Sequence, residues 1–374
     1  MKQGKVLQDK INRRISDNNL RVLTSSLPGI DFISNDYLGL ARSEKVADRI
    51  SKYFSGISHI MNGSTGSRLL SGNFEELEKL EERLAAFFHV EAALFFPTGY
   101  QANLALLSAL GGKEDTIIYD ELSHASIKDG TRLSQAKKYS FRHNDINDLS
   151  RKLRLSSGNK YVIVESIYSM DGDEANLNSI VQATEQSNAF LIVDEAHSTG
   201  LKGINGAGIC VDLNIAERIF ARVHTFGKAA GVHGGAICGS RLLRDYIINF
   251  SRPFIYSTGP SLHQVFSLQA SLDELENSDD ARDALNDRIS YFQDEIKNAN
   301  LALQFLKSDS PIQAIIIPGN AEVKKIADKI IQHGFQVKPI LAPTVKSGTE
   351  RIRICIHSFN TREEIKNLIS AASG

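Results

Sequence analysis

The sequence predicts an α/β protein with a largely parallel central sheet and a second, smaller α+β lobe. Between about residues 90 and 240, short apolar runs alternate with helical stretches, which is typical of parallel strands joined by right-handed crossovers. The run at 190–193 is apolar at every position and stops at Asp194, as expected of a strand buried on both faces. We therefore expect an N-terminal arm at 1–45, a large domain at 46–265 and a small C-terminal domain at 266–374.

The composition is that of a globular protein rather than a nucleic-acid or membrane protein. The chain has 374 residues, 42% of them hydrophobic, which is enough for a large core. Its formal net charge of −1 leaves no basic excess for nucleic acid. The charged N-terminus does not look like a signal peptide, and no apolar run approaches the roughly 18 residues of a membrane span. We expect a cytoplasmic protein without a metal site and with buried thiols at its three scattered cysteines, Cys210, Cys238 and Cys355.

The N-terminal arm is predicted to begin with an amphipathic helix. Val6, Leu7, Ile11 and Ile15 lie near one face of it. The arm could pack on another subunit or on the body of the protein, and the arginines along it could equally form a solvated face. They are Arg13, Arg14 and Arg21.

The next segments predict turns and a capped helix. Residues 33–41 contain Asn35 and are expected to form a turn that ends a short strand. Residues 62–73 form a Gly/Ser-rich loop, and Asn73 with Glu76 predicts a capping box for the following helix.

Polar groups follow three of the predicted strands. Gly99 and Tyr100 come where a strand turns into a helix, so their N–H groups could bind phosphate, although a plain turn explains them equally well. His124 begins the helix after the next strand, where a lone histidine is more often a capping or surface residue. Ser169 follows the apolar strand that begins at Tyr161.

The stretch 189–235 concentrates the reactive groups. Asp194 ends a buried strand, His197 follows in a loop, and Lys228 lies among glycines that let other groups approach its backbone. A lysine amine, a carboxylate and a further donor suit pyridoxal phosphate, which needs a Schiff-base lysine and a partner for its pyridine nitrogen. Taken singly, a strand-end cap and a solvated lysine explain these residues as well.

The C-terminal part predicts the small α+β domain. Helical stretches at about 262–306 and 321–333 alternate with strands at 312–317, 335–341 and 351–357. In the last strand isoleucines alternate with Arg351 and Arg353, so Arg353 should face away from the core, toward a cleft or toward solvent. Thr361 and Glu364 predict a capping box for the final helix.

These motifs together resemble those of the α-oxoamine synthases, fold-type I pyridoxal-phosphate enzymes that condense an amino acid with an acyl thioester. The resemblance runs in order from Asn35 to Asn360. It is carried by Ser-Asn-Asp-Tyr-Leu-Gly-Leu (34–40), Ser-His-Ala-Ser (123–126), Ser-Met-Asp-Gly-Asp (169–173), Asp-Glu-Ala-His (194–197) and Thr-Phe-Gly-Lys (225–228).

The resemblance implies a role for each candidate residue in a homodimer with shared active sites. Lys228 would form the Schiff base and move the α-proton, and Asp194 would hold the pyridine nitrogen. His124 would stack on the cofactor ring, with His197 near its phenolate oxygen and Ser169 near that oxygen or near the thioester carbonyl. The phosphate would be held by Gly99 and Tyr100, and from the neighbouring subunit by Ser257 or Thr258, and Thr225 would contact the cofactor. The substrates would be contacted by Asn35 and Arg353 at the carboxylate and by Arg21 at the phosphate of the acyl carrier or at the acyl chain.

The branch of the family is indicated by fewer residues. The stretches 141–145, 253–259 and 342–354 look most like the biotin-pathway branch, which joins L-alanine to a pimeloyl thioester of coenzyme A or of a carrier protein. Branches that use glycine with acetyl-CoA, or serine with a palmitoyl thioester, remain open. So does an inactive partner subunit, although such subunits lack the Schiff-base lysine. His233 departs from the common pattern, which leaves the choice of acyl chain open.

Overall fold

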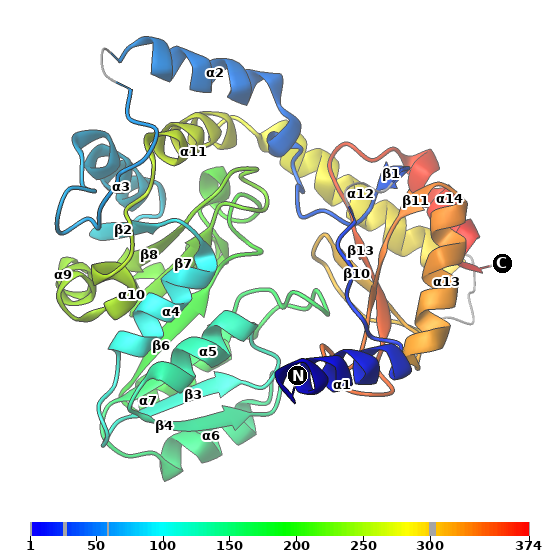
Figure 1. Ribbon diagram of the computed structural model, residues 1–374, viewed down its shortest axis with the longest axis horizontal. Helices are drawn as coiled ribbons and strands as arrows, with labels where there is room; N and C mark the ends of the chain where they lie inside the picture. The colour runs from blue at the N-terminus through cyan, green and yellow to red at the C-terminus, as the bar shows by residue number, and fades with distance from the viewer. Residues whose placement is uncertain (1, 25–27, 58–59, 299–303, 374) are drawn as a thin grey trace. The chain divides into compact units, whose positions relative to one another are not determined.

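The computed structural model describes residues 2–24, 28–57, 60–298 and 304–373, and these form two compact units (Figure 1). The large unit comprises Leu38–Tyr168 and Glu174–Arg282, and the small unit comprises Met1–Tyr37, Ser169–Asp173 and Asp283–Gly374. The division differs from the expected boundaries at 45 and 265. Residues 266–275 belong to α11 (Leu262–Leu275), which packs against α2 (Glu44–Ser55) and α3 (Glu75–Phe87) of the large unit.

The large unit is built on a seven-stranded sheet, which confirms the predicted α/β class. The order is β2-β8-β7-β6-β5-β3-β4, and only β8 runs antiparallel to its neighbours. The strands are β2 (Ala92–Phe96), β3 (Thr116–Asp120), β4 (Lys137–Phe141), β5 (Lys160–Glu165), β6 (Ala189–Asp194), β7 (Ala221–Thr225) and β8 (Gly235–Gly239).

Both faces of the sheet are buried at its inner strands, which explains why strands such as β5 are apolar at successive positions, whereas the edge strand β4 is largely exposed. In β5, Tyr161 and Ile163 join one apolar cluster, and Val162 and Val164 join another. Residues of α4 (Gly99–Ala109), α5 (Ala125–Leu133) and α9 (Arg241–Phe250) complete the first cluster. Residues of α6 (Ile146–Leu155), α7 (Leu177–Gln186) and α8 (Ile209–Asp212) complete the second. The short α10 (Arg252–Ile255) follows α9.

The helix after the 62–73 loop is only partly as predicted. The helix forms, and Leu77, Leu80 and Leu84 of α3 are fully buried. The predicted capping box is wrong, because α3 begins after Phe74 and has no side-chain cap. Asn73 instead accepts a hydrogen bond from Arg68 Nε at 3.0 Å, and Arg68 in turn pairs with the buried Glu81.

The small unit contains a four-stranded antiparallel sheet in the order β12-β13-β10-β9. Its strands are β9 (Gln304–Phe305), β10 (Ile312–Ile316), β12 (Lys338–Ile340) and β13 (Arg351–Cys355), and β1 (Ile30–Asp31) pairs separately with β11 (Phe335–Gln336). The helices are α1 (Lys2–Ser16), α12 (Asp279–Asn298, which begins in the large unit), α13 (Asn320–Gln332) and α14 (Arg362–Ser373). The capping box predicted before α14 is confirmed by reciprocal bonds between Thr361 and Glu364 of 2.8 and 3.1 Å. Among the helices described here, none is both long and apolar enough to cross a membrane.

Candidate active site

One pocket of the large unit lies at the carboxyl ends of its parallel strands, where open α/β sheets bind ligands. Strand β5 ends at Glu165 and β6 at Asp194, and the sheet register places these two residues opposite each other. The neighbouring β7 ends at Thr225. The pocket is lined by Gly99, Tyr100, Asn103, His124, Ser126, Glu165, Asp194, Ala196, His197, Val223, Thr225 and Lys228.

Two hydrogen bonds orient the carboxylate of Asp194, which is only 6% exposed. Asn103 Nδ2 donates to Oδ2 at 2.7 Å, and the backbone N–H of Ala196 donates to Oδ1 at 2.9 Å. Since each oxygen already has a donor, the plane of the carboxylate is set before any ligand arrives. His197, three residues on, is also buried and lines the same pocket.

His124 is the N-cap of α5, and the structure makes it a neutral ring in the pocket. Its Nδ1 accepts from Ser126 N at 3.2 Å and lies 2.8 Å from Ser126 Oγ. Burial lowers the pKa of His124; the carboxylate of Asp194 opposes that shift and the ammonium of Lys228 adds to it. A neutral, flat imidazole suits stacking against an aromatic ligand.

Lys228 lies in a tightly bonded turn between β7 and β8. Its carbonyl accepts from Gly231 N at 2.8 Å, and Phe226 O accepts from Val232 N at 2.9 Å. Gly231 has a φ of 68°, and a Cβ there would lie 2.2 Å from the backbone nitrogen of Ala41. The turn therefore needs glycine at this position, and its packing fixes the backbone that carries the amine.

The start of α4 forms a cradle for an anion. Gly99 and Tyr100 are its first two residues, so their N–H groups have no partner within the helix and point toward its N-terminal end. The Thr98 side chain caps the helix by accepting from Gln101 N at 3.1 Å. A Cβ on Gly99 would lie only 2.8 Å from Thr225 Oγ1, so glycine lets the helix start approach this hydroxyl.

The residues present fit pyridoxal phosphate. An amine, an oriented carboxylate, a neutral ring and an anion cradle surround one pocket, and these are the groups that the cofactor's aldehyde, pyridine nitrogen, ring face and phosphate require. Among the residues that the structure describes, no cluster of three or more histidine, cysteine, aspartate or glutamate side chains could hold a metal ion.

Among the pocket residues that sequence reasoning missed are Asn103 and Glu165. Asn103 is a buried amide among the apolar buried residues of helix α4, four residues after Gly99 and thus on the same face. Glu165 ends the apolar strand β5 just as Asp194 ends β6. A polar residue within an apolar helix and a second strand-end carboxylate were the signals that could have identified them.

Glu165 is expected to make the stability of the cofactor-free protein pH-dependent. Burial, reinforced by the charge of Asp194, raises its pKa from 4.5 to about 8. Between these two pKa values the native state keeps a proton on Glu165 that the unfolded chain has lost. The contribution of this proton to the free energy of unfolding is therefore complete below the unfolded pKa and is lost as the pH rises through about 8.

Chemical denaturation from about pH 5 to about pH 9 measures this effect. The free energy of unfolding of the wild type should fall more steeply with pH than that of Glu165→Gln, which has no proton to lose. Glu114→Gln is the control, because the Glu114 side chain is 89% exposed. Equal slopes for the wild type and Glu165→Gln would contradict the assignment.

A second cluster of candidate residues lies within the small unit, around Arg353. The guanidinium donates from Nη2 to Asn35 Oδ1 at 2.8 Å, from Nε to the carbonyl of Ser169 at 2.7 Å and from Nη1 to Cys355 Sγ at 3.0 Å. Asn35 Oδ1 also accepts from the hydroxyl of Tyr37, which is fully buried and was not predicted.

The contacts of Arg353 favour an anionic ligand. Arg353 is only 8% exposed, so the alternative of a solvated strand face is wrong; both faces of β13 are buried. All three acceptors above are formally neutral, whereas the adjacent Arg351 pairs with the carboxylate of Asp171. A buried cation held by neutral groups gains from a carboxylate ligand.

Six predicted site residues do not line the pocket around Lys228 in this chain: Asn35 and Arg353 of the cluster just described, and four others. Ser169 belongs to the small unit, where its carbonyl binds Arg353. Ser257 and Thr258 lie after α10, and Thr258 forms a β-bridge with Ser67. Arg21 is exposed, and its Nη2 donates to Thr344 Oγ1 at 3.3 Å.

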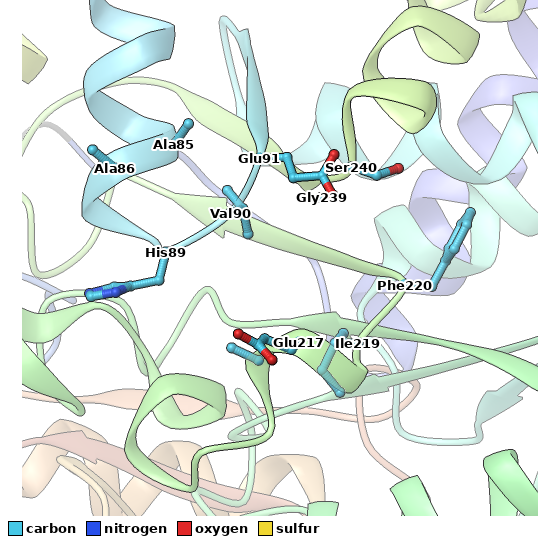
Figure 2. A pocket seen from close by; sticks show the side chains of 11 residues that line it. Ala85, Ala86, His89, Val90, Glu91, Glu217, Ile219, Phe220, Gly239 and Ser240 are labelled. Carbon is cyan, nitrogen blue, oxygen red and sulfur yellow. The ribbon is translucent and has the colours of Figure 1, made fainter.

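A larger cavity of about 650 Å³ lies at the opposite edge of the large sheet, near the start of β7 and the end of β8. Its polar side chains come from three segments: His89 and Glu91 from the turn between α3 and β2, Glu217 from the segment before β7, and Ser240 from the position before α9. They do not converge on one point (Figure 2). It contains none of the predicted site residues. Without convergent polar groups it offers no arrangement for catalysis.

The whole chain is similar to known proteins. Residues 28–371 match the family described as aminotransferase class I and II. An 8-amino-7-oxononanoate synthase from Saccharophagus degradans is 37% identical over 344 residues, which is 91% of this chain and 85% of that protein. The structure of 8-amino-7-oxononanoate synthase from Francisella tularensis has a TM-score of 0.78 and 30% identity, over 92% of this chain and 97% of that one. A serine palmitoyltransferase variant from S. paucimobilis, solved with a bound PLP–myriocin aldimine, has a TM-score of 0.90 and 25% identity, over 100% of this chain and 97% of that one.

Proposed function

The chain belongs to the aminotransferase class I and II family, and from this premise we propose that it condenses L-alanine with a pimeloyl thioester in biotin biosynthesis. The products are 8-amino-7-oxononanoate, carbon dioxide and the free carrier. The observation that carries the chemistry is the convergence of Lys228, Asp194 and His124 with the start of α4 around one pocket. The choice of alanine and the pimeloyl group rests on the similarity to 8-amino-7-oxononanoate synthases over most of the chain.

The pocket residues would hold the cofactor from several sides. When bound, pyridoxal phosphate supplies a ring that withdraws the electron pair left on the α-carbon. Asp194 would keep the pyridine nitrogen protonated, and His124 would stack on the ring. The remaining contacts would be His197 at the phenolate oxygen, and Gly99, Tyr100 and Thr225 at the phosphate.

Two groups of the chain would act on the amino acid itself. The amine of Lys228 would take the α-proton, and Arg353 with Asn35 would hold the carboxylate before it leaves as carbon dioxide. Arg353 suits this role because it is buried, fixed by three contacts and in contact with neutral acceptors. Ser169 would contribute through its backbone, since its carbonyl orients Arg353.

Arg353→Lys is expected to weaken alanine binding. A lysine keeps the charge but cannot make the bidentate contact or the three-way hydrogen bonding of the guanidinium, so KM for alanine should rise by about 10- to 100-fold with a smaller change in kcat. Arg351→Lys is the matched control, because that residue pairs with Asp171. Equal effects of the two substitutions would argue that Arg353 acts only in folding.

A substrate panel tests the reaction. We expect kcat/KM for alanine with pimeloyl thioester to exceed the values for glycine with acetyl thioester and for serine with palmitoyl thioester. Some turnover of glycine is consistent with the proposal, because one methyl group discriminates by only about 1–3 kcal/mol. If either rival pair is preferred by about tenfold or more, the chain belongs to another branch and its cofactor chemistry is unaffected.

We also propose a cytoplasmic homodimer in which Ser257 or Thr258 of one subunit contacts the cofactor phosphate of the other. The support is that neither side chain lines the pocket of its own chain, although both lie in a stretch that resembles the phosphate-binding segment of the family. Sedimentation of the active enzyme at assay concentration tests it, since a fully active monomer would exclude the shared site.

A further inference from the structure

The N-terminal helix α1 carries a basic face that the proposed reaction does not use. Lys10, Arg13 and Arg14 are spaced i, i+3 and i+4 and so lie on one side of the helix. No ion pair to an acidic side chain joins any of the three within the described part of the chain, although Asp9 and Asp17 are close in sequence. The three cations outnumber Asp17, the one carboxylate that lines the same pocket, so this surface attracts an anionic partner.

The same three cations line an open pocket of about 570 Å³ within the small unit. Its other walls are polar or small: Asp17, Asn19, Asn320, Ala342 and Pro343. Asn19 is only 8% exposed; its Nδ2 donates to Ala342 O at 3.1 Å, but its Oδ1 has no hydrogen-bond partner among the described residues. A buried acceptor without a donor is costly, so this pocket can bind a group that brings an N–H or O–H.

Apolar side chains accompany the basic ones along α1. This apolar stripe is largely exposed to solvent: the exposed fractions are 46–66% for Val6, Leu7, Ile11 and Ile15. A surface that combines cations with exposed apolar groups is typical of a protein interface, where a partner buries the apolar part and pairs with the charges. The phosphates of a free nucleotide would satisfy the cations but leave the apolar stripe exposed.

We propose that α1 and this pocket form the docking surface for an acidic carrier protein that delivers the acyl thioester. The inference rests on the proposed function, because it names the carrier of the same acyl substrate. A second copy of the chain fits less well where the twofold axis passes through α1, since that contact would place this basic face against itself. An anionic membrane fits less well too, because a bilayer surface does not enter a concave polar pocket.

The test compares two donors of the same acyl group, pimeloyl-CoA and a pimeloyl thioester on a small acidic carrier protein. In the triple variant Lys10→Glu, Arg13→Glu, Arg14→Glu, kcat/KM for the carrier-protein donor should fall by at least about tenfold, while that for pimeloyl-CoA stays within about threefold. The matched control reverses three lysines of the small unit that lie outside the pocket and changes the net charge equally. These are Lys325, Lys338 and Lys366.

Each outcome bears on the proposal. A loss confined to the carrier-protein donor, absent in the control and reduced for the wild type as salt is raised, supports it. An equal loss with both donors overturns it in favour of a coenzyme A site, and no loss overturns it outright. The proposal is also overturned if the main change in the triple variant is a loss of binding to anionic vesicles or an altered sedimentation coefficient. If the wild type turns over neither donor with alanine, the proposed function fails instead.

Discussion

Lys228→Ala should abolish turnover and the near-visible absorbance of the cofactor-loaded enzyme while leaving the fold intact. The substitution removes both the amine that attaches the cofactor and the base proposed to take the α-proton, so the rate should fall by at least about 10³-fold. The fold should persist because the turn is held by backbone bonds, including Gly231 N to Lys228 O, that alanine preserves. Steady-state kinetics, absorbance and thermal unfolding measure the three effects.

Lys202→Ala is the matched control for this experiment. Lys202 follows the Asp194–His197 turn in sequence and pairs with Glu174 at 3.6 Å, but it does not line the pocket. It should retain both absorbance and turnover. A small primary amine added to Lys228→Ala should restore part of the proton transfer. Substantial turnover by Lys228→Ala without such an amine would remove Lys228 from its role.

Asp194→Asn should lower kcat by about 10²- to 10⁴-fold and still allow the cofactor to bind. An amide is nearly isosteric with the carboxylate but cannot keep a pyridine nitrogen protonated. It also meets two fixed donors, Asn103 Nδ2 and Ala196 N, so its own NH₂ group must face one of them. A variant within about tenfold of the wild type, or about 1.4 kcal/mol, would show that the charge is not required.

Asn103→Ala tests whether the charge of Asp194 or its orientation matters more for the rate. It removes the 2.7 Å hydrogen bond to Asp194 Oδ2 but keeps the carboxylate and its bond to Ala196. We expect a loss of about tenfold, the cost of one hydrogen bond to a charged group. A loss as large as that of Asp194→Asn would mean that positioning, rather than charge, is what Asp194 contributes.

Local patterns were sufficient to predict most of the elements. The apolar runs that became β2 and β5 are buried on both faces, β6 is buried from Leu191 to Asp194 although Phe190 is 40% exposed, and the capping box before α14 forms as predicted. These features depend on neighbours within a few residues, so the sequence displays them directly. The cap predicted at Asn73 failed because the side chain of Arg68, whose ion pair with Glu81 is a tertiary contact, binds Asn73 instead.

The features of the candidate site likewise fall into those that the sequence shows and those that depend on tertiary contacts. By itself the sequence determined which groups are reactive and where they fall along the chain: Lys228 among glycines, Asp194 at a strand end and Gly99 at a helix start. Only the tertiary structure decided that Asn103 holds Asp194, that Glu165 stands opposite it with a raised pKa, and that Arg353 is buried among neutral acceptors. Asn103 and Asp194 are 91 residues apart in the sequence, and Asn35 and Arg353 are 318 residues apart. The order of the strands and the packing of the chain bring each pair into hydrogen-bond contact. The burial, the hydrogen-bond partners and the pKa of these side chains depend on such long-range contacts, and no local pattern in the sequence encodes them.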